Sequence, residues 1–181
     1  MVMKLIACFF FWLNGWKTEG EVPTQQKFVA ILAPHTSAWD VIYGMLARYI
    51  FEMDFSFYGK QEIFDAPYGF IFRAIGGIPV NRSAKSNLVD QAVKTFSERE
   101  HFILALSPEG TRKYVPNWKT GFYYIALQAK VPILLTYIDF ERKVTGLGPL
   151  FYPTGDIDKD IEEIKNFYRP IKGKHPEKGI V

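Results

Sequence analysis

The sequence predicts an α/β fold: a single domain with a central mixed, largely parallel sheet flanked by helices, and a short apolar N-terminal helix. The chain has 181 residues, of which 48% are hydrophobic, which is enough for one core that buries about two-thirds of the unfolded surface. Short apolar runs alternate with helix-like stretches, which is typical of one α/β sheet rather than of separate layers. Neither an internal repeat nor a low-complexity linker interrupts this alternation.

The expected strands are short apolar runs bounded by turn residues. They cover residues 28–33, 55–58, 78–80, 102–106 and 133–140. An edge hairpin is expected to continue from the last of these strands through residues 144–151.

The expected helices alternate with these strands. They cover residues 38–51, 67–75, 86–100, 120–130 and 156–168. Gly76 and Gly77 close the second helix, and the third is the most clearly amphipathic, with Leu88 and Phe96 on its apolar face. Beyond Pro170 the chain is rich in Lys, Gly and Pro, so we expect a frayed tail.

The N-terminus is strongly apolar over residues 5–16. This run is shorter than the roughly 20 residues that a membrane-spanning helix needs, and no small-residue cleavage site follows it. Trp12 and Trp16, with Lys4 and Lys17 beside them, resemble an interfacial membrane anchor. The alternative is a first helix packed on the protein's own core. We therefore divide the chain into a membrane-interface segment, residues 1–20, and a folded domain, residues 21–181.

Composition narrows the function classes. The net charge is +3, a mild basic excess that fits an anionic substrate or an anionic membrane surface. The chain has no dense Lys/Arg run, so nucleic acid is not an expected partner. The lone Cys8 excludes an intrachain disulfide and agrees with a reducing compartment. Three His and one Cys lack the spacing of zinc ligands, so we expect no metal.

His35 and Asp40 lie either side of four residues, where the first expected strand ends and a helix begins. The carboxyl ends of strands in an α/β sheet open onto a crevice, and His is the usual base at neutral pH. If Asp40 accepts a hydrogen bond from one imidazole nitrogen, the other nitrogen is free to take a proton. The alternative is that Asp40 only supports the helix start and His35 is an ordinary loop histidine.

Three further segments end near strand termini, and each brings a cation. They are residues 76–82 (GGIPVNR), 107–112 (SPEGTR) and 117–121 (NWKTG). Arg82 and Arg112 suit bidentate phosphate contacts, and Lys119 adds a charge at a helix start, where backbone N–H groups also bind anions. Gly110 lets the backbone approach a ligand closely, and Glu109 either holds an arginine or accepts from a substrate hydroxyl.

Together these segments resemble the glycerolipid acyltransferase superfamily, which includes the glycerol-3-phosphate and 1-acylglycerol-3-phosphate acyltransferases. His35 and Asp40 match the family's first block, GGIPVNR its second, and SPEGTR its third, with Ser107 in place of the usual aromatic residue. A fourth block, a Val-Pro-Ile strand start, matches residues 131–133. The resemblance implies a glycerol-3-phosphate acyltransferase-like fold.

The resemblance also implies an activity, the transfer of a fatty acyl group from acyl-CoA or acyl carrier protein to a hydroxyl of a lysophospholipid such as 1-acylglycerol-3-phosphate. It makes His35 the general base and Asp40 its orienting partner, with no cofactor beyond the thioester co-substrate. Acceptor binding falls to Arg82, Glu109, Gly110, Thr111 and Arg112, with Lys119 beside them. Backbone N–H groups near Gly76 or Gly110 are candidate donors to the oxyanion.

Two other functions stay open. An acyl ester or thioester hydrolase would use His35 to activate Ser37, Ser107 or water, although no G-x-S-x-G motif surrounds either serine. A non-catalytic lysolipid-binding protein would keep the fold and the phosphate contacts, but it has no use for a proton acceptor. The expected location is the cytoplasm, peripherally at the inner face of the membrane, and the sequence gives no oligomeric state.

Overall fold

A mixed, largely parallel sheet organises the computed structural model, in which residues 2–80 and 88–180 are described. The described strands lie in the order β1-β7-β6-β2-β5-β3-β4, and all neighbours are parallel except β6 and β7. The strands are β1 (Lys17–Glu19), β2 (Lys27–Leu32), β3 (Phe55–Lys60), β4 (Gly77–Val80), β5 (Phe102–Leu106), β6 (Ile133–Asp139) and β7 (Val144–Phe151). The predicted α/β class is confirmed.

One strand was missed. β1 consists of three exposed polar residues, so it carries no apolar pattern that sequence analysis can detect. It pairs in parallel with β7, and the predicted hairpin of β6 and β7 is therefore not at the edge of the sheet. The sheet thus begins within residues 1–20, the range that the sequence analysis assigned to the N-terminal segment.

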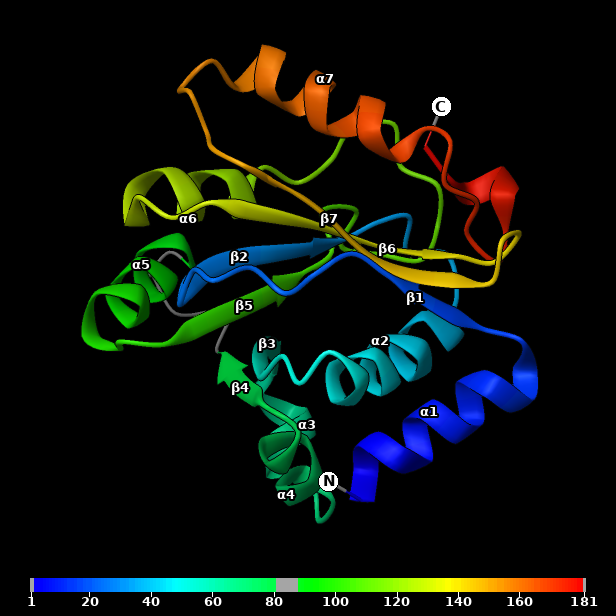
Figure 1. Ribbon diagram of the computed structural model, residues 1–181. Coiled ribbons are helices and arrows are strands. Elements are labelled where there is room, and N and C mark those ends of the chain that lie inside the picture. The colour runs from blue at the N-terminus through cyan, green and yellow to red at the C-terminus, as the bar shows by residue number, and fades with distance from the viewer. Residues whose placement is uncertain (1, 81–87, 181) are drawn as a thin grey trace.

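Helices cover both faces of the sheet (Figure 1). They are α1 (Val2–Asn14), α2 (Trp39–Ile50), α3 (Gln61–Asp65), α4 (Gly69–Ala74), α5 (Leu88–Glu98), α6 (Gly121–Ala129), α7 (Ile157–Tyr168) and the 3-10 turn η1 (Pro176–Lys178). Helices α6 and α7 lie above the sheet in this view, and α1 and α2 lie below it. The start of the predicted helix at residues 86–100 and the predicted site residue Arg82 fall outside the described residues.

The alternation of side chains along β2 divides the core in two. Val29 and Ile31 are fully buried in the cluster that includes residues of α5, α6 and α7. Phe28 and Ala30 point to the opposite face and pack with Met53. The central strand is therefore covered on both of its faces.

Helix α1 packs on the domain through one face, on which Ala7 and Phe11 are buried. Trp16 is also buried, with its ring centroid 3.8 Å from that of Tyr43. The prediction that Trp16 lies at lipid headgroups is therefore wrong, because this side chain fills a core cluster. Trp12 stays 73% exposed. No helix in the described ranges has the length and apolarity needed to cross a membrane.

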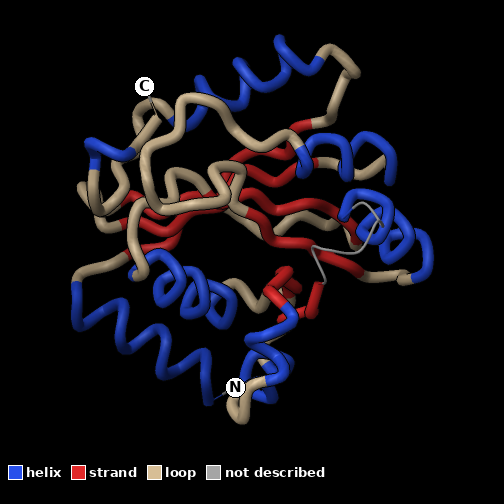
Figure 2. Tube along the Cα trace, turned by 180° about the vertical axis from the view of Figure 1, so that it is seen from behind, coloured by secondary structure: helices blue, strands red, loops and turns tan. Residues whose placement is uncertain are grey.

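Residues 171–178, called the C-terminal segment below, are ordered rather than frayed. The Phe140 N–H donates to the Lys172 carbonyl at 2.8 Å, and Gly173 is buried. Figure 2 shows the C-terminal segment beside the loops that gather at one end of the sheet. Backbone contacts hold this segment, and its Lys, Gly and Pro content does not reveal them.

Candidate active site

The His35 loop, residues 33–38, joins β2 to α2 and wraps around one carboxylate. Asp40 lies in the first turn of α2 and is 1% exposed. The backbone N–H groups of Thr36 and Ser37 each donate to Oδ2 of Asp40 at 2.8 Å. These two hydrogen bonds fix the carboxylate of Asp40 against the backbone of the His35 loop.

The predicted pair is formed. Nδ1 of His35 lies 3.0 Å from Oδ2 of Asp40, and the His35 side chain is 18% exposed. Within the described chain neither Nδ1 of His35 nor Oδ1 of Asp40 has a hydrogen-bond partner, so the contact between Nδ1 and Oδ2 is not a formed hydrogen bond in this conformation. Catalytic hydrogen bonds are often misaligned without substrate and tighten when it binds. The pair thus has the composition and distance of a base and its orienting group.

Glu109 has a role that the sequence analysis did not identify. Its Oε2 accepts from the backbone N–H of His35 at 2.7 Å and from Oγ of Ser107 at 3.4 Å. Burial raises the pKa of Glu109, and the hydrogen bond from His35 partly offsets this effect. Within the described ranges it forms no ion pair with Arg112. Glu109 fixes the main chain that carries the imidazole, and no local pattern shows a contact between residues 74 positions apart.

The segments around Gly110 and Lys119 meet. The Lys119 N–H donates to the Pro108 carbonyl at 2.8 Å. Gly110 has a φ of +63°, and a Cβ there would come within 2.7 Å of Lys119 Nζ, so the lysine side chain lies across the glycine. Thr111 is half-buried next to them, and Arg112 is exposed.

The expected oxyanion donors are engaged elsewhere. The Gly76 N–H donates to the Arg73 carbonyl, and the Gly110 N–H donates to the Ser107 carbonyl, each at 3.1 Å. Neither group is free to bind an oxyanion in this conformation. The prediction is therefore not met at these two atoms, because both already close turns.

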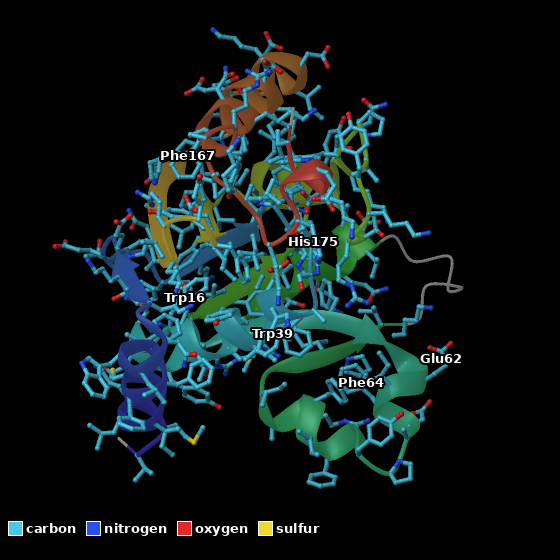
Figure 3. All side chains as sticks on the ribbon, turned by 90° about the vertical axis from the view of Figure 1, so that its right-hand side faces the viewer. Trp16, Trp39, Glu62, Phe64, Phe167 and His175 are labelled. Carbon is cyan, nitrogen blue, oxygen red and sulfur yellow. The ribbon has the colours of Figure 1, made fainter. Side chains whose placement is uncertain are left out.

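Two of the predicted cations, Arg112 and Lys119, lie within the described residues. Among described residues, neither Arg112 nor Lys119 takes part in an ion pair. Both follow β5, which pairs directly with β2, so their segment and the His35 loop leave the sheet at the same edge. Figure 3 views this side of the molecule, where His175 and Trp39 are labelled. A half-buried histidine on a buried carboxylate, at the same edge of the sheet as two cations that form no ion pair with described residues, suits proton transfer on an anionic substrate.

Comparison with known proteins agrees with this geometry. A family model described as Acyltransferase matches residues 17–138, a range that contains the His35 loop and the segments around Gly110 and Lys119. The chain belongs to the acyltransferase family. The recognition based on His35, Asp40 and the later blocks is confirmed.

Two similar proteins are named in the same terms. The chain is 27% identical over 171 residues to a 1-acyl-sn-glycerol-3-phosphate acyltransferase of Streptococcus pneumoniae (strain ATCC BAA-255 / R6), a match that covers 92% of this chain and 60% of that relative. The chain therefore spans less than two-thirds of the relative's length. It also resembles the crystal structure of the 1-acyl-sn-glycerophosphate (LPA) acyltransferase PlsC from Thermotoga maritima, with a TM-score of 0.65 and 18% identity, over 91% of this chain and 74% of that one. This second likeness supports the fold.

Proposed function

We propose that this protein transfers a fatty acyl group from a thioester donor to a hydroxyl of a lysophospholipid such as 1-acylglycerol-3-phosphate. The donor is either acyl-CoA or the acylated form of acyl carrier protein. The observation that carries the proposal is the 3.0 Å contact between Nδ1 of His35 and the buried Asp40. It lies at the edge of the sheet that also carries the segments of Arg112 and Lys119, which form no ion pair with any described residue. The names of the two relatives support the choice of acceptor.

His35 is the proposed general base. Its Nε2 takes the proton of the acceptor hydroxyl while the hydroxyl oxygen attacks the thioester carbonyl carbon. The new C–O bond forms, the C–S bond then breaks, and the proton passes from His35 to the departing thiolate. Asp40 stabilises the transient imidazolium through Nδ1. The protein itself forms no covalent intermediate in this sequence.

Orientation is the second contribution. Arg112 and Lys119 hold the acceptor phosphate, with Arg82 as a further candidate that lies outside the described residues. Fixing the phosphate places the hydroxyl between His35 and the thioester, and such positioning removes a large part of the barrier. The backbone contact from Glu109 keeps His35 in place for this step.

The proposed substrates carry fatty acyl chains, so the expected partner is a lipid surface. Exposed apolar side chains gather on α1 and the start of α2; they are Val2, Met3, Leu5, Ile6, Phe9, Trp12, Leu13, Trp39, Val41 and Ile42. Amphipathic helices of this kind bury their apolar face at the lipid headgroup boundary. We infer peripheral binding to the cytoplasmic face of an anionic membrane.

Vesicle flotation tests this partner. Trp12→Ser removes an exposed ring and leaves the buried Phe11 and Trp16 intact, so the fold is kept. Its binding to anionic vesicles is expected to fall several-fold, whereas Tyr124→Ser, at a 41% exposed ring on α6, leaves binding unchanged. Equal binding of both variants and the unmodified protein would contradict membrane docking through α1.

A donor-by-acceptor assay tests the activity. Acyl-CoA and acylated acyl carrier protein, each with a labelled acyl group, are supplied with and without 1-acylglycerol-3-phosphate in detergent. Thiol release that depends on the acceptor, with label recovered in a diacyl product, is the expected result. Free fatty acid formed independently of the acceptor would instead identify a hydrolase, and tight lysolipid binding without turnover would identify a binding protein.

A further inference from the structure

The C-terminal segment, which lies beyond the matched residues 17–138, contacts the His35 loop directly. The His175 N–H donates to Oγ1 of Thr36 at 3.2 Å. Thr36 is 2% exposed, so the segment covers its side chain. The C-terminal segment therefore forms one wall of the loop that carries His35.

Gly173 makes the closest approach between the two. A Cβ at this position would lie 2.7 Å from Oγ1 and 2.9 Å from Cγ2 of Thr36, and 3.2 Å from Cγ of Pro34. The requirement for glycine here is one of space, because its φ is not in the left-handed region. Any side chain at residue 173 must push Thr36 away.

The C-terminal segment is fixed on both sides of this contact. On one side, the Lys172 carbonyl accepts from Phe140, just after β6. On the other, Nζ of Lys174 lies 4.5 Å from the ring centroid of Trp39, the first residue of α2, and Figure 3 shows the neighbouring His175 above Trp39. A displacement at Gly173 is therefore transmitted to Thr36 instead of being absorbed by a loose tail.

Thr36 connects this contact to the chemistry. Its backbone N–H donates to Oδ2 of Asp40, the same oxygen that lies 3.0 Å from Nδ1 of His35. We propose that Gly173 is a positioning residue for acyl transfer: by its lack of a side chain it sets the place of Thr36, and through Thr36 the place of the Asp40 carboxylate against His35. This inference rests on the proposed function.

Gly173→Ala tests the positioning role. Displacements of about 1 Å at a reacting pair cost about 10²-fold in rate, so kcat is expected to fall at least 10-fold. The KM values for donor and acceptor are expected to change less than about 2-fold, because Gly173 touches neither of the cations proposed to bind the phosphate. Gly44→Ala is the control, since a Cβ at Gly44 in α2 meets nothing within 4 Å and its kcat should match the unmodified protein.

A compensating double substitution distinguishes a positioning role of Gly173 from a general effect on the stability of the fold. Thr36→Ala removes Oγ1 and Cγ2, the two atoms nearest to the added methyl group, but keeps the N–H that Asp40 accepts. The double variant Thr36→Ala/Gly173→Ala is expected to recover most of the kcat that Gly173→Ala loses. If Gly173→Ala does not fold, Thr36→Val replaces it: this variant keeps the shape, removes the acceptor of His175, and should lower kcat several-fold.

The outcomes are distinct. An unmodified kcat in folded Gly173→Ala would overturn the positioning role, as would a melting temperature that recovers in the double variant while kcat does not. In the Thr36→Val experiment, an unmodified kcat would overturn it. In each of these cases the unmodified protein still transfers acyl groups, so the proposed function stands. Absence of transfer by the unmodified protein with every donor and acceptor would instead overturn the function and the positioning role with it.

Discussion

Two carboxylates, Asp40 and Asp160, are equally buried at 1% exposure, yet their surroundings differ. Both oxygens of Asp160 are satisfied: Oδ2 accepts from the Tyr123 hydroxyl at 2.8 Å and from the Thr154 N–H at 2.7 Å, and Oδ1 accepts from Thr154 Oγ1 at 2.8 Å. In the described structure Oδ1 of Asp40 has no partner, and Oδ2 faces a histidine that it does not yet bond.

The difference in hydrogen bonding indicates which of the two carboxylates has a structural role. A buried carboxylate with both oxygens hydrogen-bonded stabilises the fold, and here it joins α7 to α6 through Tyr123. A buried carboxylate with an unused atom is costly to the fold and is kept where it can act. Asp160 is therefore assigned to stability, and Asp40 to the proposed proton transfer.

The largest effect is expected at the base. His35→Ala should lower kcat by about 10²- to 10⁴-fold, because it removes the proposed general base. Steady-state thiol release gives kcat, and circular dichroism checks the fold. His101→Ala removes an exposed histidine distant in the chain and should leave kcat unchanged. Substantial turnover by His35→Ala would remove His35 as the base and the comparison with it.

A smaller effect is expected at the unpaired cations. Arg112→Gln and Lys119→Gln should each raise the KM for 1-acylglycerol-3-phosphate about 10-fold, as is typical of losing one charged hydrogen bond. The KM for the donor should change little. Lys159→Gln, at an exposed lysine near Asp160, is the matched control and should not alter either value. Unchanged acceptor KM in both site variants would place the phosphate elsewhere.

Much of the fold and of the candidate site could be predicted from the sequence. The apolar runs at β2, β5 and β6 and the spacing of His35 and Asp40 predicted the sheet, the pair and its location, because period and local order carry that information. The contact from Glu109 to His35 and the wall formed by Gly173 were not predictable, since each depends on backbone atoms brought together from distant positions. Trp16 was misassigned because a tryptophan beside a lysine has the same pattern in a core as at a membrane.

Two buried acids, Asp160 and Glu109, are expected to change the stability of the fold with pH in opposite directions. Burial alone would raise the pKa of Asp160, but hydrogen bonds from Thr154 and Tyr123 lower it below 3.8 overall. Its stabilising contribution is present above about pH 4 and is lost as the pH falls through the lowered pKa. Burial raises the pKa of Glu109 above 4.5, so its ionisation destabilises the fold as the pH rises from that value through the raised pKa.

Urea unfolding between pH 3 and 7 separates the two effects. Asp160→Asn should lose stability mainly above pH 4, so that the curve for this variant approaches that of the unmodified protein in acid. Glu109→Gln should remove the decline in stability that accompanies the rise in pH from 4.5 through the raised pKa of Glu109. Parallel curves for all three proteins would contradict both assignments.

The most direct test of the division between Asp40 and Asp160 is to measure kcat and the free energy of unfolding in Asp40→Asn and Asp160→Asn side by side. Asp40→Asn is expected to lose at least about 100-fold in kcat with a stability change near 1 kcal/mol, because the amide oxygen still accepts from Thr36 and Ser37. Asp160→Asn is expected to lose roughly 3 kcal/mol of stability with an unmodified kcat at 25 °C. Full activity in Asp40→Asn, or lost activity in folded Asp160→Asn, would contradict the assignment.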